Sequence, residues 1–425
     1  MTLAMFLTLM AYATPAPRVP KAFVQPQGHG QKAVQRSPSI PGAALRLNHH
    51  SFSSGGISLF RKDDGCDGQR DEPYMSTCWW VGAVVRETIR KKINLALQGG
   101  GAYGAFTWGV LDHILQDGRL DIEGVTGASS GAINAIMLTD GLARGGPNEA
   151  RKRLADFWRA TSIDGKLPAL QRKVIDELFW PTKIWLDATS RYLSPYGFSP
   201  LNLNPLKELV ERFVDFEVVR RCQSPQLFVS ATNVETGRLR IFSHDKVTAE
   251  AIAASACLPN LFRAVEIDGV PYWDGAYLGN PSIFPLFQTT TTEDVLLVQL
   301  NPLQRRGTPT SSVQILSRLN EITLNSPLMG ELRAIEFVRW LIDQGRLQRG
   351  VGPGKYKRVN MHRIALDAFD KEPNSRNRFN TDYAFFEMLR DDGRRAAGRF
   401  LDAHFDDIGN RATVDLANEV KAEWA

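Results

Sequence analysis

Two glycine-rich turns constrain the fold of this chain more than any other feature. The turn at 98–104, "QGGGAYG", follows the apolar run "INLALQ" and opens the helical pattern "AYGAFTWGVLDHILQDG". The turn at 127–131, "GASSG", follows "LDIEGVT" and opens "SGAINAIMLTDGLARGG". An apolar run closed by glycine predicts a buried strand, and a periodic stretch that ends in glycine predicts a helix. Two strand–turn–helix units in succession predict an α/β fold with a mostly parallel sheet.

Periodicity extends this pattern along the rest of the chain. Further strands are expected over 226–234, 238–243, 294–301 and 358–366, and further helices over 149–160, 204–214, 247–256, 313–345 and 383–406. We place the catalytic domain at 93–300, and 301–425 as a C-terminal helical region that holds one further strand and packs on that domain. Residues 1–74 lack any period and are predicted to be disordered, with 75–92 as a lead-in to the first strand.

Charge and cysteine content narrow the classes of function. The net charge of +5 arises mostly from the first 90 residues, which hold ten Lys/Arg against six Asp/Glu, whereas the remainder holds 41 against 40. A nearly neutral body argues against a nucleic-acid partner. Neither a metal nor a disulfide scaffold is expected, because no metal-ligand spacing joins the four cysteines, Cys66, Cys78, Cys222 and Cys257.

The lengths of the apolar segments indicate where in the cell the protein is expected. No apolar run reaches the roughly 18–20 residues that a transmembrane helix needs. Residues 1–13, "MTLAMFLTLMAYA", are apolar but lack the basic residues that begin a secretory signal. We therefore expect a protein that is cytoplasmic or peripheral to a membrane, with export as the alternative in which residues 1–13 are a signal peptide.

The second glycine turn presents a candidate nucleophile. Gly127 and Gly131 fit the pattern G-x-S-x-G around Ser129, whereas centring the pattern on Ser130 puts alanine at both flanks. A nucleophile at a strand-to-helix turn sits in strained backbone, and the flanking positions approach each other so closely that glycine is needed at both. The N-terminus of the following helix favours an anion there. The pattern therefore predicts Ser129, and not Ser130, as the catalytic serine.

The first glycine turn has two competing interpretations. Gly99, Gly101 and Gly104 match G-x-G-x-x-G, which is typical of dinucleotide sites, but the second strand does not end in the acidic residue that would hold a ribose. The alternative is an oxyanion hole for acyl transfer, in which backbone N–H groups of Gly99, Gly100 and Gly101 converge on the developing charge. We favour the second interpretation, and a nucleotide-binding oxidoreductase remains the less favoured alternative.

The sequence offers two kinds of proton acceptor for the serine. Among the seven histidines, His29, His49, His50, His113, His244, His362 and His404, the best placed is His244, which follows an expected strand. A His-dependent α/β-hydrolase esterase is therefore one alternative. The other candidate is Asp274, which follows the aromatic run "VPYW" and precedes Gly275 and Ala276.

Together these blocks resemble the patatin-like phospholipase family over residues 93–300. The resemblance rests on "GGGAYG", "GASSG" and "DGA", with "SATNVETGRLRIF" and "ASACLPNLF" between them. It implies a three-layer α/β/α fold and a Ser129–Asp274 dyad that works through a covalent acyl-enzyme without histidine or cofactor. Supporting motif positions are Gly104, Gly127, Gly131, Gly275 and Ala276. The chain departs from the family pattern at Tyr103, where many members have Arg or Lys, and in "LFRAV", which lacks the usual proline.

The implied substrate is a lipid or another hydrophobic acyl ester. The stretch 161–205 is rich in Trp, Phe and Tyr, so it is either a lid or interfacial surface that meets a membrane or an aromatic core patch. A catalytically inactive lipid-binding relative is a further alternative. With an ordinary carboxyl pKa of about 3.9 at Asp274, the pH profile is expected to lack a limb near the histidine value of about 6.5.

Overall fold

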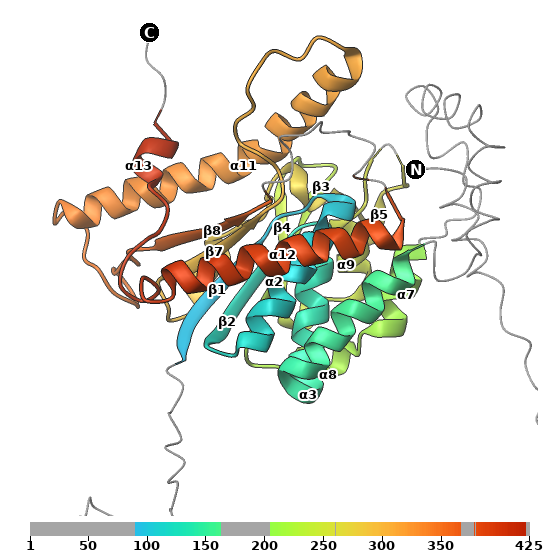
Figure 1. Ribbon diagram of the computed structural model, residues 1–425, viewed down its shortest axis with the longest axis horizontal. Coiled ribbons are helices and arrows are strands. Elements are labelled where there is room, and N and C mark those ends of the chain that lie inside the picture. The colour runs from blue at the N-terminus through green and yellow to red at the C-terminus, as the bar shows by residue number, and fades with distance from the viewer. Residues whose placement is uncertain (1–89, 163–204, 260, 367–377, 379, 422–425) are drawn as a thin grey trace, which may run out of the picture. The chain divides into compact units, whose positions relative to one another are not determined.

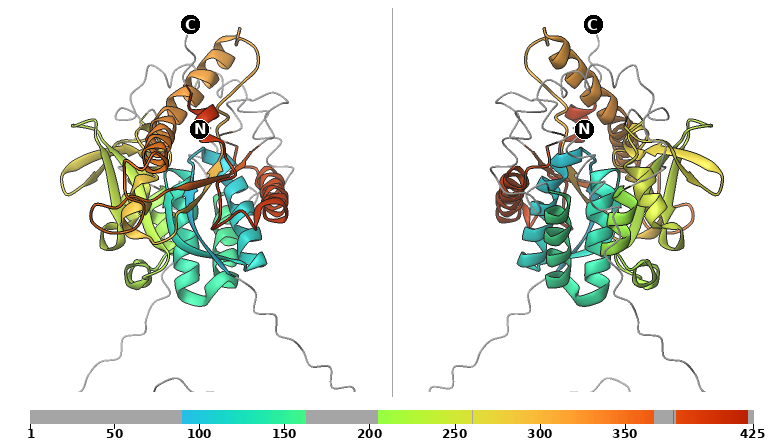
Figure 2. Two further views of the ribbon diagram at one scale, coloured as in Figure 1. Left: turned by 90° about the vertical axis from the view of Figure 1, so that its left-hand side faces the viewer. Right: turned by 90° about the vertical axis from the view of Figure 1, so that its right-hand side faces the viewer.

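A mostly parallel sheet organises the part of the chain that the structure describes. The computed structural model describes residues 90–162, 205–259, 261–366, 378 and 380–421. Its strands are β1 (Lys91–Leu97), β2 (Leu120–Gly127), β3 (Gln226–Asn233), β4 (Leu239–Ser243), β5 (Val265–Ile267), β6 (Val270–Asp274), β7 (Asp294–Gln299) and β8 (Asn360–Ala365). Figure 1 shows helices on both sides of this sheet, and Figure 2 shows the same arrangement edge-on.

The strand order brings both glycine turns to one edge of the sheet. The order is β5-β6-β3-β2-β1-β7-β8, with β4 also paired to β3. Strands β3, β2, β1, β7 and β8 run parallel, and β4, β5 and β6 add antiparallel pairs beside β3. Leu97 at the end of β1 lies opposite Gly127 at the end of β2. Parallel strands end at a common edge, where such sheets place their sites.

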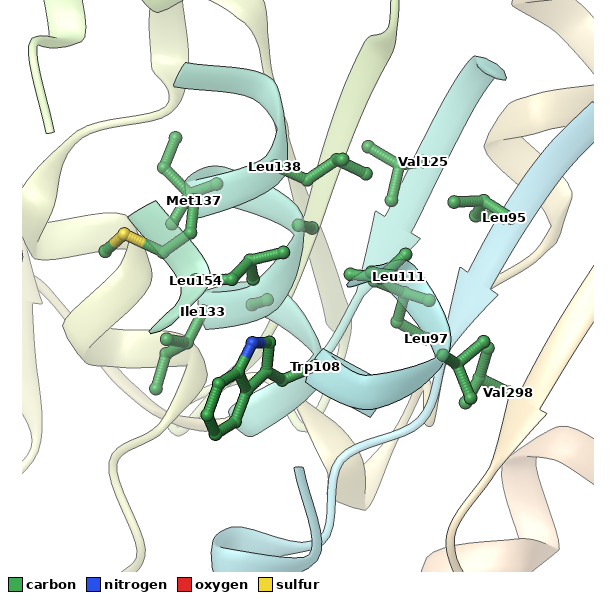
Figure 3. Close-up of a cluster of buried hydrophobic side chains, with 14 of the residues drawn as sticks. Leu95, Leu97, Trp108, Leu111, Val125, Ile133, Met137, Leu138, Leu154 and Val298 are labelled. Atoms are coloured by element: carbon green, nitrogen blue, oxygen red, sulfur yellow. The ribbon is translucent and has the colours of Figure 1, made fainter. Parts of the chain in front are cut away.

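Alternating side chains of the central strands feed two hydrophobic clusters. Leu95 and Leu97 of β1 belong to one cluster, whereas Ala96 between them belongs to the other. Successive side chains of a strand point to opposite faces, so a continuous apolar run requires cover on both sides. Figure 3 shows part of the first cluster, in which side chains of β1 and β2 meet those of the neighbouring helices.

Helices supply that cover. The first cluster draws on α2 (Gly104–Asp117), α3 (Ser130–Thr161), α7 (Pro205–Phe213), α8 (Phe216–Arg221), α9 (Ala249–Ser255) and α12 (Tyr383–His404). The second draws on α10 (Phe284–Thr289), α11 (Ser312–Asp343) and α13 (Leu416–Glu419). Three-residue 3-10 turns lie at η1 (Gly101–Tyr103), η3 (His244–Lys246) and η4 (Gly275–Tyr277). The three-layer α/β/α architecture is confirmed. None of the described helices is long and apolar enough to cross a membrane.

Most expected elements are present at their expected positions. All six expected strands match β1–β4, β7 and β8 to within two residues at either end. Within α3, Gly146 has non-helical φ/ψ of 75° and −158° and precedes Pro147, so the two expected helices there are separate runs. Strands β5 and β6 and helices α8, α10 and α13 are too short to show a period. The predictions for 1–74 and for most of 75–92 and 161–205 lie outside the described residues. The boundary of the catalytic domain at residue 300 stays a prediction.

Helices α2 and α12 cross at two glycines. A Cβ on Gly109 would lie 1.9 Å from the carbonyl oxygen of Arg390, and one on Gly393 would lie 2.1 Å from that of Phe106. These distances leave no room for a methyl group, because the obstructing atoms are backbone. The contact therefore specifies how α12 packs on α2, the helix that follows the first glycine turn.

We expect Gly393→Ala to lower the free energy of unfolding by about 1–3 kcal/mol, as overpacking of a close helix contact does. The matched control is Gly398→Ala in the same helix, where the nearest atom is the flexible His113 side chain at 3.3 Å. That change should be neutral or stabilising by up to about 1 kcal/mol, because alanine favours helix. Chemical denaturation measures both. Equal stability of the two variants would contradict the packing argument.

Candidate active site

Ser129 occupies the tight turn between β2 and α3. Its φ of 54° and ψ of −126° lie in a region that side-chain-bearing residues rarely adopt. The Ser129 N–H donates to the Ser255 hydroxyl at 3.0 Å and to the Ser255 carbonyl at 3.1 Å, which ties the turn to the end of α9. The strained backbone is therefore held from outside, as expected for a nucleophile elbow.

The glycines around Ser129 are required by close backbone approach. A Cβ on Gly131 would lie 2.1 Å from the Leu97 carbonyl oxygen, and one on Gly127 would lie 2.5 Å from the Gly131 carbonyl group. A Cβ on Gly99 would lie 2.8 Å from the Ser129 Cβ. The three glycines thus bring the first turn directly against the serine, as the motif predicts.

Asp274 ends β6, opposite Ala231 of β3. Its side chain accepts a hydrogen bond from the Ala276 N–H at 2.8 Å, and the residue is 1% exposed. A Cβ on Gly275 would lie 2.0 Å from the Ser230 carbonyl oxygen, so glycine is needed for the chain to turn here. Gly275 and Ala276 therefore shape the turn that holds the carboxyl group.

Burial raises the pKa of Asp274 to about 7, although the hydrogen bond from the Ala276 N–H and the nearby Ser129 hydroxyl oppose this shift. The candidate nucleophile is therefore close enough to the candidate base to act on its pKa. The expectation of an ordinary carboxyl pKa is therefore wrong, because the sequence does not reveal how completely the fold removes this group from water. A carboxylate with a pKa near neutrality is a stronger base than an exposed one.

Two neighbouring groups stay protonated at neutral pH. Burial, together with the Asp274 carboxylate, raises the pKa of Cys257 to about 12, and its thiol donates to the Arg263 carbonyl at 3.0 Å. Burial and the same carboxylate also raise the pKa of Tyr277. Asp274 is thus the group in this cluster that titrates near pH 7.

The glycine loop differs from the sequence prediction at two of its three donors. The Gly99 N–H donates to Asn280 Oδ1 at 2.7 Å, and the Gly100 N–H donates to the Ser130 hydroxyl at 3.0 Å. Both amides are therefore already occupied by side chains that a local motif does not include. The Gly101 N–H makes no hydrogen bond within the described part of the chain, and neither does the Ser130 N–H at the start of α3.

A buried polar network supports this loop, and sequence reasoning missed it. The Gln98 side chain accepts hydrogen bonds from the N–H groups of Leu300 and Asn301 and donates to Asn325 Oδ1 at 2.9 Å. Asn280 donates to the Leu324 carbonyl at 3.2 Å. These polar residues stand at strand ends and inside a helix with no motif around them, so only the fold brings them together.

Tyr103, the departure from the family pattern, is a buried member of the first hydrophobic cluster. It is 4% exposed, and the Arg378 guanidinium lies 5.7 Å from the centre of its ring. Burial is the main cause that raises its pKa. The phenol therefore acts as a packing residue beneath the glycine loop.

Described histidines lie apart from the serine. His362 is buried and bonds Asp294 at 3.0 Å and Thr413 at 3.2 Å, and His404 bonds Asp407 at 2.9 Å. His113 packs near Gly398 of α12. His244 follows Ser243, which pairs with Phe228 of β3, whereas Asp274 pairs with Ala231 of the same strand. The backbone of His244 is therefore at a different position along β3 from Asp274. His29, His49 and His50 lie outside the described residues.

Metal-ligating side chains do not gather in the described ranges. No group of three or more His, Cys, Asp or Glu there could hold a metal ion.

A sequence model of the patatin-like phospholipase family matches residues 95–287. This range includes both glycine turns and Asp274. An uncharacterized protein of Acanthamoeba polyphaga mimivirus, R571, is 29% identical over 194 residues. That alignment covers 43% of this chain and 57% of the viral protein, so the match spans less than two thirds of that relative.

Two solved structures are more distant. VipD from Legionella pneumophila aligns with a TM-score of 0.34 and 15% identity, over 74% of this chain and 67% of that one. A chain of the heterodimeric ExoU–SpcU complex from the type III secretion system of Pseudomonas aeruginosa aligns with a TM-score of 0.33 and 13% identity, over 75% of this chain and 52% of that one.

Proposed function

Because residues 95–287 belong to the patatin-like phospholipase family, we propose that this protein hydrolyses acyl esters of lipids through Ser129 and Asp274. The domain is of the lipid acyl hydrolase type. The observation that carries the proposal is the nearness of the Ser129 hydroxyl to the buried Asp274 carboxyl. Burial raises the pKa of this carboxyl to about 7, and the Ser129 hydroxyl opposes that shift. The proposed nucleophile and base are thus neighbours, and the base is tuned to neutral pH.

The reaction proceeds in two steps. Ser129 Oγ attacks the ester carbonyl carbon while its proton passes to the Asp274 carboxylate. The tetrahedral intermediate then collapses, the bond to the alcohol oxygen breaks, and Asp274 returns the proton to the leaving alcohol. Water attacks the acyl-Ser129 ester, gives a proton to Asp274 and releases the fatty acid, after which Ser129 recovers its proton.

The negative charge on the intermediate needs preorganised donors. We assign this role to the N–H groups of Gly101 and Ser130, because both lack hydrogen-bond partners within the described residues. Ser130 directly follows Ser129, and Gly101 belongs to the loop whose Gly99 approaches the Ser129 Cβ. The N-terminus of α3 adds its positive partial charge at the same point. The engaged N–H groups of Gly99 and Gly100 hold the loop in shape.

The alternatives have less support. A His-dependent esterase needs a histidine that bonds the serine, and none of the three histidines whose side chains the structure describes, His113, His362 and His404, does so. A dinucleotide site needs free amides in the glycine loop, whereas Gly99 and Gly100 are engaged. A protein that binds lipid without hydrolysing it would not react with a fluorophosphonate probe at Ser129, so labelling distinguishes that alternative from the proposed enzyme. A panel of acyl esters, assayed with wild type beside Ser129→Ala, identifies the lipid class.

We expect Ser129→Ala to abolish both ester hydrolysis and labelling by a fluorophosphonate probe, because the attacking oxygen is removed. Ser130→Ala should still be labelled, although more slowly, because its hydroxyl accepts from Gly100 rather than attacking substrate. Gel fluorescence measures labelling, and circular dichroism checks folding. Loss of labelling in Ser130→Ala alone would reverse the assignment.

We expect Asp274→Asn to lower turnover by several orders of magnitude, because the amide keeps the shape of the carboxyl but accepts no proton. His244→Ala, His362→Ala and His404→Ala serve as matched tests of the histidine alternative and should keep most activity wherever they fold. Steady-state kinetics on a soluble ester gives the comparison. A folded histidine variant as inactive as Ser129→Ala would falsify the dyad.

The pH profile of kcat/KM should rise through about pH 7, because the carboxylate form of Asp274 is the active base and burial raises its pKa to that value. This limb coincides with that of a histidine, so its midpoint alone does not identify the group. Ionisation of a carboxyl group has little enthalpy, whereas that of imidazole has much. The midpoint should therefore stay constant between two assay temperatures, and a marked shift would indicate histidine.

A further inference from the structure

Exposed apolar side chains gather on α11. The exposed large hydrophobic residues of this helix are Ile315, Leu316, Leu319, Ile322, Phe337 and Trp340, each between 38% and 59% exposed. Phe337 and Trp340 stack on each other with ring centres 6.1 Å apart. In the described part of α12, by contrast, Met388 is the only large hydrophobic residue exposed to this degree. A concentration of this kind marks an interaction surface.

In the N-terminal half of α11 the polar side of the helix is buried and the apolar side is exposed, whereas an ordinary surface helix has the reverse arrangement. The buried positions of this half are polar, since Ser317, Glu321 and Asn325 are at most 7% exposed. Glu321 bonds Arg305 at 2.6 Å and 2.7 Å. Ile315, Leu319 and Ile322 share the outer face at the spacing i, i+4, i+7. The apolar side of the helix therefore faces out because its polar side is committed inward.

This helix is attached directly to the active site. Asn325 bonds Gln98, and Leu324 accepts from Asn280, which in turn accepts from the Gly99 N–H. Helix α11 also contacts η4, which begins directly after Asp274. Figure 1 shows the N-terminal half of α11 projecting beyond the end of the sheet to which β1 leads. The N-terminal half of α11, which carries Ile315, Leu319 and Ile322, thus lies at the end of the sheet that carries the glycine loop.

Charge around α11 favours an anionic partner. Residues 303–358 carry ten Lys/Arg against four Asp/Glu, although the chain beyond residue 90 as a whole is nearly neutral. Glu321 and Glu331 are turned inward, but Lys357 is buried as well, and Arg305 and Arg318 pair with Glu321. The segment keeps a net positive charge after these pairs are set aside. Apolar residues flanked by bases suit a surface of anionic lipid.

We propose that the outer face of α11, with Ile315, Leu316, Leu319, Ile322, Phe337 and Trp340, docks this protein on an anionic lipid surface. The proposal rests on the proposed lipid hydrolysis, since it explains how a site beside α11 meets lipid. The apolar side chains enter the boundary between headgroups and acyl chains, while the flanking arginines attract the headgroups.

The test is sedimentation of the full chain with vesicles of phosphatidylcholine alone or mixed with phosphatidylserine. Wild type should bind the mixed vesicles more tightly than vesicles of phosphatidylcholine alone. This difference should become smaller at high salt. Leu319→Gln combined with Ile322→Gln should weaken binding about tenfold or more, because two side chains no longer enter the apolar layer. The matched control is Met388→Gln, which changes a side chain 49% exposed on the opposite helical layer and should bind like wild type.

Further readouts separate this proposal from the proposed activity. The double variant should hydrolyse the soluble ester p-nitrophenyl butyrate at the wild-type rate, and Ser129→Ala should bind vesicles normally. Vesicle binding without ester hydrolysis by wild type would overturn the activity and leave the docking surface standing. Failure of wild type to bind mixed vesicles, or equal binding by the double variant, would overturn the docking surface. So would a dimer in analytical ultracentrifugation that the double variant abolishes, because the face would then join two copies.

Discussion

The approach of the α3 N-terminus to the end of β1 is the constraint on which the site depends. The Leu97 carbonyl oxygen lies 2.1 Å from where a Cβ of residue 131 would be, so only glycine allows the two segments to meet. That contact sets the turn in which Ser129 adopts its positive φ, and it brings the first glycine loop against the serine. This backbone contact brings the proposed nucleophile, the loop and the helix terminus together, and the side chains of Ser255, Asn280 and Ser130 then hold them there.

The second requirement is a dry setting for the base. Asp274 comes from an antiparallel strand beside β3, whereas Ser129 comes from the parallel part of the sheet. Strand β3 pairs with both parts, so it fixes their relative position. Burial by α9 and η4 raises the pKa of the carboxyl group, which turns a weak base into one suited to neutral pH.

The parts of this protein that sequence predicts well are those with short-range patterns. The strands before each glycine turn, the helix over 313–345 and the strand-to-helix turn at Ser129 all follow from periods or spacings within a few residues. The bond from Gly99 to Asn280 joins residues 181 positions apart, and no local pattern signals it. The orientation of α11 is missed for another reason. A surface helix usually buries its apolar side. Here Glu321 and Asn325 have hydrogen-bond partners in the interior and Ser317 is buried, so the polar side of the helix faces inward.

The burial of Asp274 makes the two members of the proposed dyad unequal targets for chemical reagents. At 1% exposure the carboxyl group is shielded from a carbodiimide and its amine, which modify carboxylates at the surface. Ser129 offers its hydroxyl at the start of a helix and is open to small electrophiles. A covalent inhibitor of this protein would therefore attach at Ser129 and leave Asp274 unmodified.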